Sequence, residues 1–204
     1  MFVFQQENAC HSLPYYAVFR EIEKLLLNQN PIVIAIDGPS GSGKSTLAEV
    51  LEANYACQVV PMDHFFLKPE QRTAGRLGEP GGNIDYERFL EQVIPNLKAG
   101  NSFSYGVYDC GENAIVRENI IEPHILTVIE GSYSHHPKLS AIYDLKVFLD
   151  ISPERQRERL LKRNGPKMLE RFLNEWIPLE NTYFSAFKIE EKSDVIITTH
   201  KGDS

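Results

Sequence analysis

Short apolar runs alternate with helical patterns along most of this chain. The apolar runs, rich in valine and isoleucine, lie at 32–36, 58–62, 125–130, 145–150 and 194–199. Helical spacing of apolar residues is found in Tyr15 to Asn30, Ser45 to Tyr55, Tyr86 to Leu97, Pro153 to Arg163 and Lys167 to Trp176. Strands that read as unbroken apolar stretches, with helices between them, are typical of a parallel sheet covered on both faces. We therefore predict an α/β fold of three layers.

One segment departs from this alternation. Residues 103–119, FSYGVYDCGENAIVREN, indicate a small antiparallel excursion from the main sheet. The chain contains no internal repeat, low-complexity tract or linker-like stretch, so we predict one domain over 1–204 with a helical lead-in at 1–30. In open sheets of this kind, ligands bind beyond the carboxyl ends of the strands.

Composition and charge exclude several classes of protein. Hydrophobic residues make up 42% of the 204 residues and charged residues 24%, which is ordinary globular usage. No apolar run approaches the roughly 20 residues needed to span a bilayer, and the start MFVFQQENACHS lacks the basic flank of a secretion signal. The three cysteines, Cys10, Cys57 and Cys110, have no metal-ligand spacing and are expected to be reduced thiols. These features lead us to expect a cytoplasmic protein, and the net charge of -7 leads us to expect that it binds neither nucleic acid nor membranes.

A phosphate-binding motif lies between the first apolar run and the helix after it. Gly38, Gly43, Lys44 and Ser45 fit G-x-x-x-x-G-K-[ST] in the strand-to-helix context that the motif requires. Glycines let backbone amides turn inward, the helix adds its positive dipole end, and the lysine brings a full charge to the β- and γ-phosphates. A flexible turn is the alternative interpretation. The residues expected to hold the nucleotide are Gly38, Ser40, Gly41, Ser42, Gly43, Lys44, Ser45 and Thr46.

Acids stand at the ends of three predicted strands. Asp63 follows a strand expected beside the one that carries the phosphate loop, and it could accept the proton of an attacking hydroxyl. A helix N-cap or a turn is its alternative role. Glu130 ends ILTVIE, where it could hold Mg²⁺ together with the Ser45 hydroxyl, or merely solubilise the strand end. Asp37 precedes the loop and is expected to shape the turn.

The order of these segments resembles one kinase family. GPSGSGKST, MDHFF, NIDYERF, YGVYD, VIEGSY and LKVFLDISPERQRERLLKR occur at about the spacing seen in uridine kinase and its relatives among the P-loop small-molecule kinases, which include phosphoribulokinase and pantothenate kinase. The resemblance covers the chain from Ile32 to Thr199. It implies a P-loop NTPase fold of the nucleoside-kinase type. It also implies phosphorylation of a nucleoside 5′-hydroxyl by ATP or GTP in the presence of Mg²⁺.

The resemblance implies roles for particular residues as well. Asp63 stands in the place of the catalytic base, Asp85 in that of the carboxylate that holds ribose hydroxyls, and Tyr108 in that of an aromatic next to the base. Phe66 could stack on a nucleobase or anchor its loop to the core. After the Tyr-Asp pair, where uridine kinases have a histidine and an arginine, this chain continues CGENAIVREN. The acceptor is therefore left open between a nucleoside and another small alcohol, such as pantothenate, a sugar phosphate or nicotinamide riboside.

Basic residues gather in two further segments. In a lid region at about 153–170, one helical face would carry Arg155, Arg159, Lys162 and Arg163. We expect Arg159 and Arg163 to close over ATP, and a surface helix with local ion pairs is the alternative. The covering segment KPEQRTAGRLGEPGGN holds Arg72 and Arg76, which could suit an anionic acceptor or be merely solvated.

The sequence thus predicts a Mg²⁺-dependent small-molecule kinase whose catalytic residues are Lys44, Asp63, Arg159 and Arg163. The alternative from another class is a nucleotide-binding regulatory protein without an acceptor site. Self-association is left open. The adjacent histidines of SHHP, at 134–137, are expected in a loop rather than a zinc site, and Thr199 and His200 are candidate adenine contacts.

Overall fold

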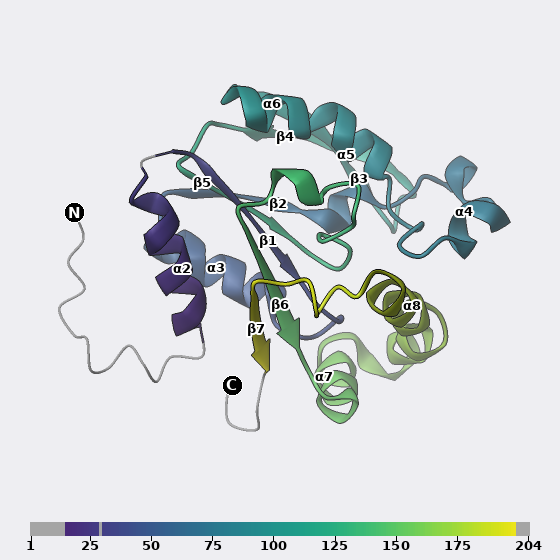
Figure 1. The fold of residues 1–204 in the computed structure, drawn as a ribbon. Helices are drawn as coiled ribbons and strands as arrows, with labels where there is room; N and C mark the ends of the chain where they lie inside the picture. The colour runs from purple at the N-terminus through teal and green to yellow at the C-terminus, as the bar shows by residue number, and fades with distance from the viewer. Residues whose placement is uncertain (1–14, 29, 199–204) are drawn as a thin grey trace.

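A parallel sheet forms the centre of the fold (Figure 1). The computed structural model describes residues 15–28 and 30–198. In this part of the chain the sheet has the order β2-β5-β1-β6-β7, and every pairing is parallel. Its strands are β2 Cys57–Pro61, β5 Leu126–Glu130, β1 Ile32–Asp37, β6 Leu145–Asp150 and β7 Val195–Thr198. The sheet predicted from the apolar runs is therefore confirmed.

The strand order corrects one expectation. The strand before Asp63 is expected from the sequence beside β1, whereas β2 pairs with β5, and β5 pairs with β1. β5 thus separates the strand that carries the phosphate loop from the strand that leads to Asp63. A crossover helix lets the chain skip a position in a parallel sheet, so chain order does not fix strand order. The register aligns Glu130 with Ile36 on one side and with Pro61 on the other.

Each face of the sheet has its own hydrophobic core. Ile34 and Ile36 pack on one face with α2 (Tyr16–Leu26) and α3 (Lys44–Asn54). Phe148 of β6 points to the other face, into a second cluster that includes side chains of the helix α8 (Ile177–Phe187). Because side chains alternate along a strand, a strand buried on both faces must be apolar at every position, which explains the unbroken runs. Helices on both faces confirm the three layers (Figure 1).

The antiparallel excursion is also confirmed. β3 (Phe103–Asp109) pairs with β4 (Ala114–Ile121), with a register shift between Val107 and Tyr108. Tyr105 of β3 is buried, and its ring lies 5.0 Å from that of Phe65 in η1, a 3₁₀ turn over Met62–Phe65. The hairpin therefore packs against the segment that contains Asp63.

The helix predicted over Tyr86 to Leu97 is two helices. α5 spans Tyr86–Gln92, and α6 spans Ile94–Ala99 with a proline in its first turn. That proline has no amide hydrogen, so it cannot continue the hydrogen-bond ladder of α5. The segment before these helices is short and irregular, with a 3₁₀ turn η2 at Pro69–Gln71 and a one-turn helix α4 at Ala74–Gly78.

The helix predicted over Pro153 to Arg163 is confirmed as the first part of a helix that breaks at Gly165. α7 spans Pro153–Arg171, but Gly165 interrupts it with a φ of 76° just before Pro166. A π-helical turn follows at Phe172–Trp176, and α8 continues over Ile177–Phe187. The helix predicted at Lys167 to Trp176 thus crosses from α7 into the π-turn, and α8 was not predicted. No single helical period fits this region, because a glycine-proline step and a π-turn each reset the apolar face.

The cysteines are free thiols where the structure describes them, with Cys57 half-buried and Cys110 exposed. Burial raises the pKa of the Cys57 thiol to about 11. Cys10, Thr199 and His200 lie outside the described residues. None of the described helices combines the length and the apolar character that a membrane crossing requires.

Candidate active site

The phosphate loop joins β1 to α3, as its motif predicts. Lys44 begins α3, and Gly43 before it has a φ of 106°. A Cβ on Gly38, whose φ is 144°, would lie 2.3 Å from the carbonyl oxygen of Leu149. Only glycine fits there. The first-turn amides of α3 have no partner within the helix, and their positive ends face the loop.

Side chains of α7 bind the carbonyl groups of the loop. Nε2 of Gln156 donates to the Ser40 oxygen at 3.0 Å. The guanidinium of Arg159 donates to the oxygens of Gly41 and Ser42, at 3.1 and 3.2 Å. Because a carbonyl and the next amide point in opposite directions, this arrangement turns loop amides away from α7 and toward the motif's interior.

Two features of the loop fit a bound polyphosphate. The ammonium of Lys44 spans the loop and donates to the carbonyl oxygens of Gly38 and Pro39, at 2.8 and 3.0 Å. The hydroxyl of Ser42 is buried and has no hydrogen-bond partner among the described residues. A buried polar atom without a partner is costly unless a ligand or water satisfies it.

The two residues expected to hold a metal ion lie face to face. Oγ of Ser45 lies 3.5 Å from Oε1 and 3.4 Å from Oε2 of Glu130. Burial raises the pKa of the Glu130 carboxyl, with a further contribution from the negative charge of Asp63. A hydroxyl and a carboxylate are the hard oxygen donors that Mg²⁺ prefers. The chemistry of this pair therefore fits Mg²⁺.

Asp63 is exposed and follows by two positions Pro61, which the sheet register aligns with Glu130. It lies in the first turn of η1, whose N-cap is Pro61, so Asp63 is not the N-cap. Among the described residues, no hydrogen bond or ion pair holds its carboxylate. Its negative charge contributes to the raised pKa of Glu130 and of Cys110 at the tip of the hairpin. Asp63 is thus an available carboxylate close to both the metal pair and the hairpin.

Asp85 is buried and already has partners. It is the N-cap of α5, where Oδ1 accepts from the amide of Arg88 at 3.0 Å. Oδ2 accepts from Nε2 of Gln71 at 2.9 Å and lies 3.5 Å from Nε of Arg88. To bind a substrate hydroxyl, as the sequence predicts, this carboxylate would have to exchange Gln71 for the substrate.

The predicted aromatic contacts differ in their surroundings. The hydroxyl of Tyr108 accepts from the guanidinium of Arg72 at 2.7 Å. Arg72 also donates to the carbonyl oxygen of Leu67 at 3.1 Å. Phe66 is partly buried against the core, where it anchors its segment through a bridge to Ile84. The Arg72 and Tyr108 pair therefore joins the covering segment to the hairpin.

Known proteins resemble this chain in sequence and in fold. A uridine kinase from Clostridium perfringens is 25% identical over 186 residues, which cover 83% of this chain and 88% of that protein. A uridine kinase from Bacillus cytotoxicus is 26% identical over 184 residues, with coverage of 82% and 85%. The structure of a possible uridine kinase from Bacillus stearothermophilus superimposes with a TM-score of 0.63 at 21% identity, and covers 89% of this chain and 99% of that one. No protein-family model matches the chain.

The chain is similar to uridine kinases in sequence and to a possible uridine kinase in fold. Its similarity to curated kinases extends over more than four fifths of its length, which confirms the resemblance inferred from the sequence motifs.

The two arginines predicted for the lid have different partners. Arg159 contacts the phosphate loop, as described above. Arg163 is exposed, and its Nε donates to Oδ1 of Asn164 at 2.8 Å. The structure therefore brings Arg159, but not Arg163, to the loop in its present conformation.

Two buried acids accept hydrogen bonds from backbone amides of the phosphate loop. Asp37 accepts from the amides of Gly38, Tyr133 and His135, at 2.7, 3.1 and 2.9 Å, which agrees with its expected role in the turn. Glu180 of α8 accepts from both the amide and the hydroxyl of Ser40. Sequence reasoning missed Glu180. A single acid within the mostly apolar stretch WIPLENTYFSAF was the available signal.

The adjacent histidines have separate partners. Nε2 of His135 lies 3.2 Å from the Ala35 oxygen, and the ring of His136 stacks on Tyr86 at 4.8 Å. Burial lowers the pKa of His136 to about 4. Among the described residues, no group of three or more potential metal-ligating side chains gathers in a site.

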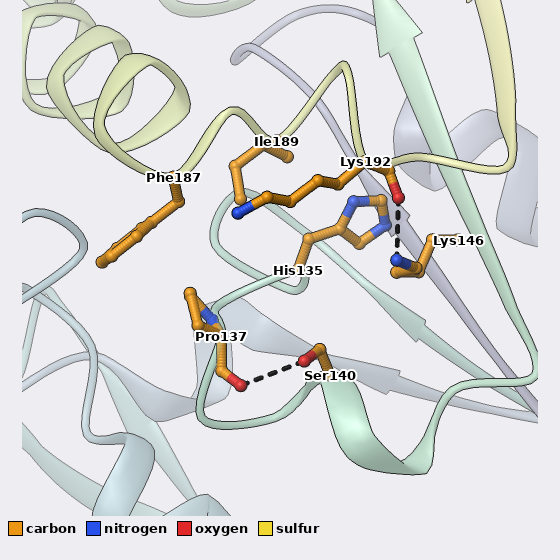
Figure 2. Close-up of a pocket in the computed structure, with 7 residues that line it drawn as sticks. All are labelled: His135, Pro137, Ser140, Lys146, Phe187, Ile189 and Lys192. Carbon is orange, nitrogen blue, oxygen red and sulfur yellow. Dashed lines mark hydrogen bonds between the residues drawn. The ribbon is translucent and has the colours of Figure 1, made fainter.

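A pocket of about 90 Å³ lies elsewhere, between the turn after β5 and the turn after α8 (Figure 2). It is lined by His135, Pro137, Ser140, Lys146, Phe187, Ile189 and Lys192. None of the candidate active-site residues lines it. The ammonium of Lys146 already donates to the backbone oxygen of Lys192 at 2.7 Å, so we assign no role to this pocket.

Proposed function

We propose that this chain transfers a phosphoryl group from ATP to a hydroxyl of a small molecule, with Mg²⁺ as the metal. The observation that carries the proposal is the convergence of three groups at one edge of the sheet. These are the ammonium of Lys44 in the loop, the facing oxygens of Ser45 and Glu130, and the available carboxylate of Asp63. Phosphoryl transfer needs these elements, namely charge neutralisation, metal ligands and a base for the attacking hydroxyl.

Each residue has a role in the proposed reaction. Lys44 and the loop amides bind the β- and γ-phosphates and orient the terminal group. Ser45 and Glu130 would hold Mg²⁺, which when bound would neutralise phosphate charge. Asp63 accepts the proton of the acceptor hydroxyl as that oxygen attacks the γ-phosphorus, while the bond from the γ-phosphorus to the β,γ-bridging oxygen breaks and ADP leaves. Most of the rate enhancement would come from positioning and electrostatics, because the transferring phosphoryl group needs charge stabilisation more than covalent help.

The acceptor that we propose first is the 5′-hydroxyl of a nucleoside. The similarity to proteins named uridine kinase supports it. Tyr108 would lie beside the base, and Asp85 would hold the ribose hydroxyls after releasing Gln71. GTP is a second candidate donor.

One observation favours a second class of acceptor. The guanidinium of Arg72 donates a hydrogen bond to the Tyr108 hydroxyl, next to the tip of the hairpin. At this tip the pKa of the Cys110 thiol is raised by burial and by the charge of Asp63, and lowered by that of Arg72. A guanidinium at this position would pair with a phosphate or carboxylate on the acceptor. Sugar phosphates and pantothenate are alcohols of this kind.

The test is ADP release by the purified chain with MgATP and one acceptor at a time. The panel contains uridine, cytidine, purine nucleosides, nicotinamide riboside, sugar phosphates and pantothenate. We expect ADP release that depends on one class of acceptor, with the phosphorylated alcohol as the second product. Tight ATP binding without acceptor-dependent turnover across the panel would instead support a regulatory nucleotide-binding protein.

A further inference from the structure

Ser40, in the middle of the phosphate loop, is held by side chains from two helices outside the loop. Its hydroxyl donates to Oε1 of Glu180 at 2.5 Å, and its amide donates to Oε2 at 3.0 Å. Its carbonyl oxygen accepts from Nε2 of Gln156 at 3.0 Å. Every polar group of Ser40 is therefore engaged. Together these bonds fix both peptide units that flank the residue.

Glu180 itself is buried, with 3% of its surface exposed. Besides the two bonds from Ser40, Oε1 accepts from the hydroxyl of Ser132 at 2.7 Å. Ser132 lies two positions after Glu130, which is the last residue of β5. A carboxylate suits this position because it accepts hydrogen bonds at both oxygens and carries no donor that burial would leave unsatisfied.

We infer that Glu180 is a positioning residue for nucleotide binding, an inference that rests on the proposed function. Glu180 binds the amide of Ser40 on the side of α8, while Gln156 binds the carbonyl of the same residue from α7. The loop is thereby held in a conformation that leaves the amides of Gly41 and Gly43 to bind phosphate, whereas the amide of Ser42 donates to the oxygen of Pro39 at 3.0 Å. A loop that is ordered before binding loses less conformational entropy when the nucleotide arrives. Glu180 therefore acts through Ser40 and touches no reacting atom.

The experiment compares nucleotide affinity with stability. The purified full chain and its variants are titrated with MgATP by calorimetry, and thermal unfolding is recorded without nucleotide. Glu180→Ala, which removes all three acceptor bonds, is expected to weaken ATP binding about tenfold or more. Glu180→Gln keeps one acceptor oxygen and is expected to recover most of that loss. Where turnover is measurable, the KM for ATP should rise while the KM for the acceptor stays near its wild-type value.

A second variant, Ser40→Ala, tests the inference even if Glu180→Ala does not fold. It removes only the loop hydroxyl, and it should weaken ATP binding by about threefold. In the Glu180→Ala background the same change should have no further effect, because its partner is already missing. The matched control is Glu175→Ala, which removes an exposed acid of the neighbouring π-turn that pairs with Arg171.

Wild-type ATP affinity in both Glu180→Ala and Ser40→Ala would overturn the inference and leave the proposed function standing. So would equal losses in Glu180→Ala and Glu175→Ala. If the wild-type chain binds no nucleoside triphosphate, the proposed function fails and this inference fails with it. The two failures are therefore distinguishable in one set of titrations.

Discussion

The hydroxyl of Ser45 lies 3.4 Å from Oε2 of Glu130, although 85 positions separate the two residues in the chain. Parallel pairing of β1 with β5 produces this contact, because it aligns Ile36, one residue before the end of β1, with Glu130. The same register aligns Glu130 with Pro61 of β2, two residues before Asp63. Glu130 is thus the carboxylate that links the phosphate loop to the proposed base.

Glu130→Gln should stabilise the protein and abolish Mg²⁺-dependent transfer. Burial raises the pKa of Glu130 in the folded state, so its charged form at neutral pH costs stability. The neutral amide avoids that cost, and we expect a rise in Tm of about 2–4 °C at pH 7 without Mg²⁺. The gain should shrink as the pH falls, because protonation neutralises the wild-type side chain as well. An equal or lower Tm for the variant across pH 5 to 8 contradicts the prediction.

Turnover should depend on pH through the same carboxyl. A protonated Glu130 cannot hold a cation, and its raised pKa means that protonation begins at a higher pH than for an ordinary glutamate. We expect kcat/KM to fall as the pH is lowered. Raising the Mg²⁺ concentration should move the midpoint to lower pH, because the cation competes with the proton. If the midpoint of the fall in kcat/KM at low pH does not change with the Mg²⁺ concentration, a group other than Glu130 is responsible for the titration.

Asp63→Asn should remove turnover and preserve nucleotide binding. The amide cannot accept the hydroxyl proton, so we expect kcat to fall by about 10²–10⁴-fold. The Kd for MgATP should stay within about twofold of wild type, because Asp63 lies outside the loop. Single-turnover assays and calorimetry measure the two quantities. Glu70→Gln, another exposed acid of the nearby segment, serves as the control. Near-normal kcat in Asp63→Asn would exclude Asp63 as the base.

Arg72→Ala separates the two classes of acceptor. If the acceptor carries a phosphate or carboxylate, loss of the guanidinium should raise its KM about tenfold or more, with little change in the KM for ATP. For a neutral nucleoside, the KM should change by less than about threefold. Arg20→Ala removes an exposed arginine of α2 and controls for net charge. An unchanged KM for an acidic acceptor would place its anionic group elsewhere.

Gly38→Ala should destabilise the fold by about 3 kcal/mol. The added Cβ would lie 2.3 Å from the Leu149 oxygen, at a φ of 144° that side chains rarely adopt. Gly75→Ala is the matched control, because nothing lies within 4 Å of its Cβ and alanine favours the helix α4. Urea unfolding measures both. Equal stability of the two variants would show that the loop relaxes at little cost.

Local patterns predicted the strands, the hairpin and the phosphate loop because their signals lie within a few neighbouring residues. Motif spacing alone placed Lys44 at the start of α3 and Glu130 at the end of β5. Ser45 and Glu130 were named from separate motifs, and the sheet register explains why they meet.

The remaining features depend on contacts between distant segments. The position of β5 between β1 and β2 is set by crossover geometry, which no local pattern encodes. Asp85 matched a family motif, but its N-cap role required knowledge of where α5 begins. Glu180 became informative only when the fold brought α8 to Ser40.

The strand order also bears on how the proposed acceptor site could diversify. β2 is an edge strand that reaches β1 only through β5, and the hairpin packs on the segment that follows β2. Substitutions among Asp63, Arg72 and Tyr108 would thus leave the pairing of β1, and the loop that it carries, intact. Under the proposed function, the specificity for the acceptor could change in evolution while the part that binds ATP stays the same.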